Sequence, residues 1–124
     1  MNLTFTFNGE PVPQSRPRFG RGGRVYEPAR MTAFKSAIRA AASAAMAGSS
    51  PLSEPVACTL RFFRKFKATA RNFGDADNLA KAVLDAVNGL AFVDDSQVTS
   101  LLIQKFQDRE NPRVEVSIEP AVAQ

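Results

Sequence analysis

Residues 75–89 read Asp75-Ala-Asp-Asn-Leu-Ala-Lys-Ala-Val-Leu-Asp-Ala-Val-Asn-Gly89, and residues 93–98 read Val93-Asp-Asp-Ser-Gln-Val98. Together they gather five aspartates around one lysine, Lys81. Apolar residues recur every three or four positions in the first run, which predicts an amphipathic helix over residues 78–89 with Gly89 as its stop. The rest of the chain is organised around this helix and the acidic turn after it.

The charge of the chain changes sign at Asp75. Residues 1–74 contain 12 Lys and Arg against three Glu, whereas residues 75–124 contain four Lys and Arg against nine Asp and Glu. The net charge is therefore +9 before Asp75 and −5 from Asp75 onward. A basic region suits a polyanion such as DNA, because phosphates supply most non-specific affinity. A solvated surface that keeps the protein soluble is the alternative explanation.

Length and composition predict one soluble globular domain over residues 1–124. No apolar run approaches the ~20 residues of a membrane span, and the N-terminus lacks the pattern of a signal peptide, so no membrane partner is expected. The single cysteine, Cys58, excludes an internal disulfide, reads as a small core residue and favours a cytoplasmic location. The chain has no His, so hydrolysis would depend on carboxylates, Lys, Arg, Tyr and metal-bound water.

Alternating and helical patterns give the order of elements. Strands are predicted over residues 3–8, 24–26, 56–66, 98–106 and 113–119, and helices over residues 28–47 and 78–89. Asn111 and Pro112 are interpreted as part of a hairpin between the last two strands. The order β-β-α-β-α-β-β predicts an α+β fold in which two helices cover a single mixed β-sheet.

Two basic regions are candidate DNA contacts. Residues 9–23 are rich in Pro, Gly and Arg and are expected to lack regular structure. The alternative to DNA contact is that this segment is a mobile linker. Residues 61–71 mix basic residues, Arg64 among them, with phenylalanines that can instead belong to the core. The candidate residues are Arg16, Arg18 and Arg21 in the first region and Lys65, Lys67 and Arg71 in the second.

Asp77, Lys81 and Asp85 recur every four residues, so they share one face of the predicted helix, opposite its apolar stripe. Asp77 and Asp85 are about 12 Å apart along the axis, too far to share one Mg²⁺ that lies about 2.1 Å from each ligand oxygen. A partner for Asp77 must come from elsewhere in the fold, and Asp94 or Asp95 is the natural supplier. Lys81, about 6 Å along the same face, can reach a phosphate.

These acidic residues also have structural interpretations. Asp77 can be the N-cap of the helix, and it can form exposed ion pairs along the helix face through Lys81. Asp94 and Asp95 can belong to an ordinary turn. None of these interpretations explains Asp75 or the change in charge. An EF-hand is excluded, since the loop lacks the Gly at its sixth position and the Glu at its twelfth.

The sequence resembles the RusA-like crossover-junction endodeoxyribonucleases, a family of Holliday junction resolvases. The resemblance lies in the two runs quoted above, in Gly9-Glu-Pro-Val-Pro-Gln-Ser-Arg-Pro-Arg18 and in Val25-Tyr26, and it extends over nearly the whole chain. It implies a RusA-like fold and a homodimeric, Mg²⁺-dependent nuclease that acts on four-way junctions in recombination and repair, in a family often encoded by prophages. It leaves open whether Mn²⁺ substitutes for Mg²⁺.

The resemblance also implies roles for individual residues. Asp75, Asp77 and Asp95 would be the catalytic, metal-binding carboxylates, Lys81 the catalytic lysine and Asp94 a supporting acidic residue. Two other functions stay open: a protein that binds branched DNA without cutting it, and a metal-dependent nuclease for flaps or other branched DNA.

Overall fold

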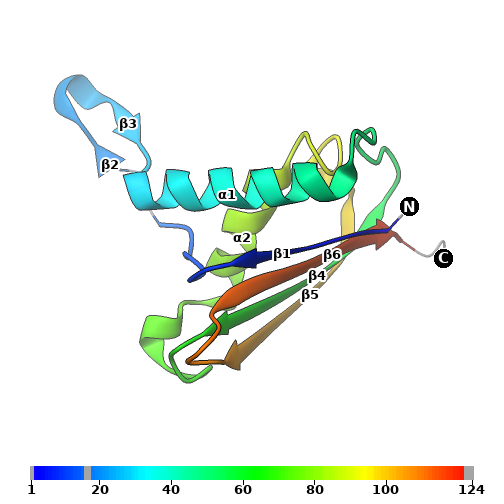
Figure 1. The fold of residues 1–124 in the computed structure, drawn as a ribbon. Coiled ribbons are helices and arrows are strands. Elements are labelled where there is room, and N and C mark those ends of the chain that lie inside the picture. Colours follow the sequence, from blue (N-terminus) through cyan, green and yellow to red (C-terminus); the bar gives the residue numbers. More distant parts are fainter. Residues whose placement is uncertain (1, 16–17, 122–124) are drawn as a thin grey trace.

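The computed structural model describes residues 2–15 and 18–121, whose elements are drawn in Figure 1. The helices are α1 (Ala29–Met46) and α2 (Ala76–Val87). The strands are β1 (Leu3–Asn8), β2 (Arg18–Phe19), β3 (Val25–Tyr26), β4 (Val56–Arg64), β5 (Val98–Gln107) and β6 (Arg113–Pro120). Short 3₁₀ helices are η1 (Arg21–Gly23), η2 (Arg71–Phe73) and η3 (Asp95–Gln97). Within the described residues, none of the helices has the length and apolarity needed to cross a membrane.

The main sheet has four strands in the order β1-β6-β4-β5. β6 pairs antiparallel with β1 and with β4, whereas β5 pairs parallel with β4. Figure 1 shows α1 and α2 on the same side of this sheet. The predicted α+β class, in which two helices cover one mixed sheet, is confirmed.

The predicted hairpin between the last two strands is wrong, because β4 lies between β5 and β6. β4, α2 and β5 form a βαβ unit, whose crossover helix makes β5 parallel to β4. With β5 on one side of β4, β6 pairs on the other. Asn111 and Pro112 therefore belong to a connection that passes the end of β4, a span of about 10 Å at the usual strand spacing.

The hydrophobic core fills the space between the sheet and the helices. β4 alternates buried and half-buried residues along its whole length, as expected for a central strand with one face toward helices. Phe7 of β1 contacts Phe34 of α1 edge to face, with ring centroids 5.4 Å apart. Cys58 is buried in this core as predicted, and burial raises the pKa of its thiol to about 11. The buried residues of α1 are Met31, Phe34, Ile38, Ala42 and Met46.

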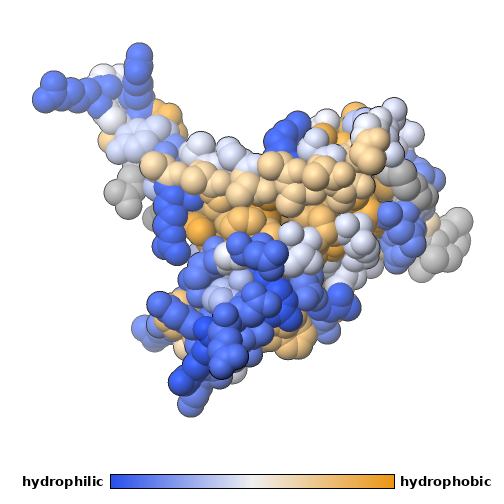
Figure 2. Space-filling model, in the orientation of Figure 1, coloured by the Kyte–Doolittle hydropathy of each residue, from blue (hydrophilic) through white to orange (hydrophobic). Residues whose placement is uncertain are grey.

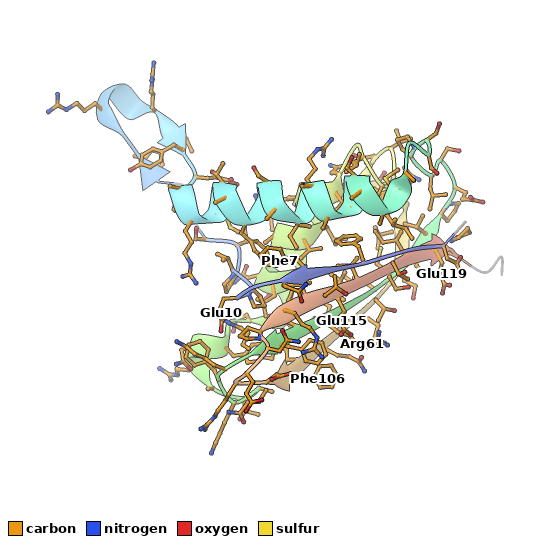
Figure 3. All side chains as sticks on the ribbon, viewed as in Figure 1. Phe7, Glu10, Arg61, Phe106, Glu115 and Glu119 are labelled. Carbon is orange, nitrogen blue, oxygen red and sulfur yellow. The ribbon has the colours of Figure 1, made fainter. Side chains whose placement is uncertain are left out.

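The other face of the sheet carries polar and aromatic side chains, and no helix of residues 2–15 and 18–121 covers it. In Figure 3, Arg61, Phe106 and Glu115 lie on this face, whereas Phe7 lies toward α1. Arg61 Nε donates to Gln104 Oε1 at 2.9 Å, which links β4 to β5 across the face. This side of the sheet is separated by the sheet itself from the acidic stretch on α2.

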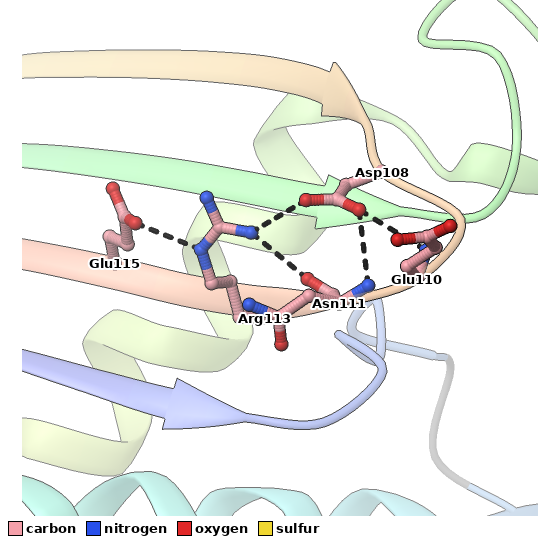
Figure 4. Close-up of polar contacts among 5 residues, drawn as sticks. All are labelled: Asp108, Glu110, Asn111, Arg113 and Glu115. Carbon is pink, nitrogen blue, oxygen red and sulfur yellow. Dashed lines mark hydrogen bonds and ion pairs between the residues drawn. The ribbon is translucent and has the colours of Figure 1, made fainter.

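Arg113 holds the connection between β5 and β6 in place (Figure 4). Its Nη1 lies 2.8 Å from Asp108 Oδ2 and its Nε lies 2.9 Å from Glu115 Oε2. Nη1 also donates to the Asn111 carbonyl at 3.0 Å. The hydrogen bond from Arg113 is the main cause that lowers the pKa of Asp108. The connection that passes β4 is thus fixed by side-chain contacts.

Residues 18–26 form a two-stranded ribbon that projects beyond the N-terminal end of α1 (Figure 1). The expectation that residues 9–23 lack regular structure is wrong for residues 18–23, which contain β2 and η1. Gly22 and Gly23 have φ values of 72° and 76°, and this left-handed conformation lets the chain reverse. The strand predicted at residues 24–26 exists as β3, but it pairs with β2 outside the main sheet.

Candidate functional site

α2 begins at Ala76, two residues earlier than predicted, so Asp75 occupies the N-cap position. The Asp75 carbonyl accepts a helical hydrogen bond from the Leu79 N–H at 3.0 Å, but its carboxylate accepts no capping bond. Asp77 lies in the first turn with an exposed side chain, so the alternative that Asp77 is the N-cap is wrong. Neither carboxylate is used to cap the helix, and both lie at its positive end.

A groove of about 350 Å³ lies between α2, η3 and β5. Asp77 and Lys81 line it from α2, and Asp95 lines it from η3. The structure therefore brings three of the four residues proposed for catalysis to one surface hollow, and Asp75 is the one that does not line it. The remaining lining residues are Ala80, Leu84, Asp85, Leu101 and Ile103.

Asp94 and Asp95 have different surroundings although they are adjacent. Asp94 is the N-cap of η3, and its Oδ2 accepts from the Ser96 N–H at 3.1 Å. Ser96 lowers the pKa of Asp94, first through its side-chain hydroxyl and then through this backbone N–H. Asp94 is therefore part of a turn, as the structural interpretation of this residue proposed. Asp95 lines the groove.

Gln97 completes the cap and fixes η3 to the rest of the fold. Its Oε1 accepts from the Asp94 N–H at 2.8 Å. Its Nε2 donates to the carbonyls of Leu52 and Glu54 at 2.9 Å and 2.8 Å. Sequence reasoning assigned no role to Gln97, although its position three residues after Asp94 is the spacing of a capping box.

Asp85 belongs to a separate chain of charges. Its Oδ2 lies 3.6 Å from the Lys35 Nζ, which also lies 2.5 Å from Glu27 Oε1. The hydrogen bond from Lys35 is the main cause that lowers the pKa of Glu27. Among the ion pairs of residues 2–15 and 18–121, none joins Lys81 to Asp77 or Asp85, so the alternative interpretation of ion pairs along the helix face is wrong.

Arg64 is buried, which corrects its interpretation as part of an exposed basic turn. Only 5% of the residue is exposed. Its Nε lies 2.8 Å from Glu10 Oε2, and its Nη1 donates to the carbonyls of Asn72 and Phe73. Position 64 continues the inward alternation of β4, and that pattern could have identified it. Arg64 therefore holds the segment that leads to Asp75.

Gly74, the residue before Asp75, is tightly surrounded by other parts of the chain. Its φ of 101° lies in the left-handed region, and a Cβ at this position would be 2.6 Å from Pro13 Cγ. Lys105 Nζ donates to the Gly74 carbonyl at 3.1 Å, so β5 also contacts this residue. The close approach of Pro13 explains why Gly stands here, and it places residues 9–15 against the start of α2.

A family model described as endodeoxyribonuclease RusA matches residues 8–119. The chain belongs to the RusA endodeoxyribonuclease family. It is also 35% identical over 136 aligned positions to YqaN of Bacillus subtilis (strain 168), described as an uncharacterized protein, and the alignment covers 94% of each chain. The resemblance inferred from the two acidic runs is confirmed at the level of the family, and the family match extends from the last residue of β1 into β6.

The groove carries the oxygen donors that a hard divalent cation prefers. In the part of the chain that the structure describes, no three Asp, Glu, Cys or His side chains are close enough to hold a metal ion by themselves. Mg²⁺, however, keeps several waters and is commonly held by one or two carboxylates together with substrate phosphates. Asp77 and Asp95 supply two carboxylates to the lining of the groove, which is the number that such a site uses.

The structure describes some, but not all, of the basic side chains proposed to bind DNA. Arg16 lies outside the described residues, and so does the side chain of Arg18, whose backbone belongs to β2. Arg21 is exposed in η1. Lys65 and Lys67 are exposed in the turn that joins β4 to η2, and Arg71 is exposed at the start of η2, four residues before Asp75. The turn after β4 thus presents positive charge close in sequence to the acidic groove.

Proposed function

We propose that this member of the RusA family is a Mg²⁺-dependent endonuclease that resolves four-way DNA junctions by paired, symmetric phosphodiester hydrolysis, in recombination and repair. The observation that carries the proposal is that Asp77, Lys81 and Asp95 line one groove although they come from two elements. Paired carboxylates with a lysine are the groups that metal-assisted phosphate hydrolysis needs when His is absent.

Each residue has a distinct task in this proposal. Asp77 of α2 and Asp95 of η3 would hold the metal ion in the groove, and Asp75 would add a carboxylate from the N-cap of α2. Bound Mg²⁺ supplies a more acidic water and polarises the phosphoryl oxygens. Lys81 offsets negative charge on the scissile phosphate or on the departing 3′ oxygen.

We further propose that the active form is a homodimer. A four-way junction has two-fold symmetry, and its resolution requires two nicks at equivalent positions. Two copies related by a two-fold axis present two equivalent grooves, which matches the symmetry of the substrate. The number of nicks per bound junction therefore tests the assembly as well as the chemistry.

The test is cleavage of a labelled four-way junction with Mg²⁺, with Mn²⁺ and with EDTA. Wild type is expected to make paired nicks only with a divalent metal. Asp77→Asn is expected to lower the cleavage rate at least about 100-fold while junction binding persists, because the ligand is lost but the groove keeps its shape. Glu110→Gln removes one charge from an exposed carboxylate in the β5–β6 connection and serves as the matched control.

The outcomes separate the competing functions. Junction binding without nicking under either metal would identify a DNA-binding protein without catalysis. Faster nicking of flaps than of four-way junctions would identify a nuclease for other branched DNA. Equal cleavage by wild type and Asp77→Asn would remove the groove from the chemistry.

A further inference from the structure

The β2–β3 ribbon carries the most exposed large apolar side chain of the described residues. Phe19 is 77% exposed and Val25 is 59% exposed. These two residues are direct cross-strand partners, so their side chains share one face of the ribbon. An isolated two-stranded ribbon has little stability of its own, and exposing a phenylalanine on it adds nothing to the core. We therefore infer that this apolar face, formed by Phe19 and Val25, contacts a binding partner.

Both ends of the ribbon segment are attached to the helix that carries the acidic residues. Before the ribbon, the Gln14 N–H donates to the Asn78 carbonyl of α2 at 2.9 Å. After the ribbon, Glu27 contacts Lys35, which in turn contacts Asp85 of α2. Gln14 before the ribbon is thus linked to α2 directly, and Glu27 after it is linked to α2 through Lys35 of α1; the same helix carries Asp77 and Lys81.

A continuous surface leads from the acidic groove to this root. A second hollow, of about 230 Å³, is lined by residues of α1 and α2 and by Glu27, which directly follows the ribbon. Asp85 lines both this hollow and the acidic groove. A polymer held in the groove can therefore extend along the protein surface toward the ribbon.

The charge of the ribbon favours nucleic acid as the occupant of its apolar face. Residues 18–26 contain three Arg and no Asp or Glu. Arg21 and Arg24 are exposed at the turn, and Figure 2 shows strongly hydrophilic residues at the tip of the projection in the upper left. Arginine beside an exposed aromatic ring is the combination that grips phosphates and stacks on unpaired bases. Base faces are hidden inside duplex arms, but they become accessible where strands exchange at a branch point.

We propose that the β2–β3 ribbon is a branch-point reader. Phe19, supported by Val25, stacks on bases that are unstacked at the centre of branched DNA, while Arg21 and Arg24 contact the flanking phosphates. The ribbon thereby gives preference for branched over linear DNA. The proposal rests on the proposed function only in taking branched DNA as the substrate, because stacking requires neither the metal ion nor cleavage.

The test measures binding without cleavage. Anisotropy titrations with EDTA compare Phe19→Ala and wild type on a four-way junction and on a linear duplex of the same composition. Phe19→Ala is expected to weaken junction binding about tenfold or more and to leave duplex binding unchanged, since stacking on one base has about this effect. Phe19→Trp, which keeps a stacking ring, is expected to restore junction preference. Arg21→Ala is the matched control on the same ribbon, and it is expected to weaken binding to both DNAs.

A probe at the branch point makes the contact visible. With 2-aminopurine in a central position of the junction, wild type and Phe19→Trp are expected to change its fluorescence, and Phe19→Ala is not. Unchanged junction preference in Phe19→Ala would overturn the proposal. The proposal would also fail if the only effect of Phe19→Ala were a change of oligomeric state, measured by light scattering. If wild type binds junctions through Phe19 but cuts nothing, the ribbon proposal stands and the nuclease proposal fails. If wild type cuts junctions and Phe19→Ala binds and cuts them equally well, the reverse holds.

Discussion

Asp94 and Asp95 show how neighbouring carboxylates come to do different work. The backbone of η3 directs Asp94 onto the Ser96 N–H, and that contact makes Asp94 part of the turn. Asp95 is not the N-cap of η3, and it lines the groove together with Asp77. The position of Asp95 therefore depends on the contacts that hold η3, and most of these are made by Gln97.

Gln97→Ala is expected to slow cleavage about tenfold or more while junction binding changes little, because η3 loses its contacts to Leu52 and Glu54. The free energy of unfolding is expected to fall by about 1 kcal/mol, the usual net value of such hydrogen bonds. Single-turnover cleavage and urea titration measure the two effects. Gln97→Glu keeps the acceptor for the Asp94 N–H but sets a carboxylate against two carbonyl oxygens, so it is expected to give no rescue at neutral pH. Rescue by Gln97→Glu would show that the contacts to residues 52 and 54 do not position Asp95.

At this scale, sequence reasoning located the acidic residues but not what holds them. The helical spacing of Asp77 and Lys81, together with the distance that set Asp85 aside, required a partner from another element, and Asp95 lies in the groove with them. Arg64 was grouped with exposed basic residues because charge outweighed the alternation of β4, which in fact buries it. A buried arginine is retained where carbonyls and a carboxylate satisfy it, and those partners come from residues 10, 72 and 73, which only the fold brings together.

The secondary elements were predicted more accurately than their pairing. Periodicity identified both helices and the four strands of the main sheet, because burial on one face imposes a period on the sequence. The strand order was missed at β5 and β6, where adjacency in sequence suggested a hairpin. The helix between β4 and β5 requires a crossover, and β6 then pairs with the other edge of β4 instead of with β5.

The start of α2 depends on the close approach of Pro13 to Gly74, so Gly74→Ala tests how this element is placed. The substitution is expected to lower the free energy of unfolding by about 3 kcal/mol, from a strained backbone and from the contact of the new Cβ with Pro13. Urea titration measures the loss. Cleavage by the folded fraction is expected to fall as well, because Asp75 follows directly.

The matched control for this prediction is Gly48→Ala in the turn after α1. Gly48 also has a positive φ, 83°, but a Cβ there would meet nothing within 4 Å. Its expected cost is about 1 kcal/mol, from the backbone alone. In the double variant Pro13→Ala/Gly74→Ala, part of the lost stability is expected to return. Equal losses for the two single glycine variants would show that Pro13 does not constrain the start of α2.

At the scale of the whole molecule, the charge asymmetry becomes a spatial arrangement. Three acidic residues of the second part of the chain, Asp77, Asp85 and Asp95, line the groove, while exposed basic residues lie in the ribbon and in the turn after β4. Without a divalent cation, a phosphate that enters the groove is repelled by these carboxylates. Phosphates outside the groove can contact the basic residues. This arrangement predicts that the affinity for DNA comes from the basic segments rather than from the groove.

Arg71→Ala tests this division. If Arg71, at the start of η2, contacts a phosphate, its removal lowers the slope of log affinity against log salt by about one, because one counterion fewer is released. The slope is measured by anisotropy on a four-way junction in EDTA, from low to moderate salt. Arg61→Ala removes the same charge from the open face of the sheet, where Arg61 contacts Gln104, and is expected to leave the slope unchanged. If instead Arg61→Ala lowers the slope and Arg71→Ala does not, DNA lies across the open face of the sheet, and the acidic groove on the helical side is not where the backbone is cut.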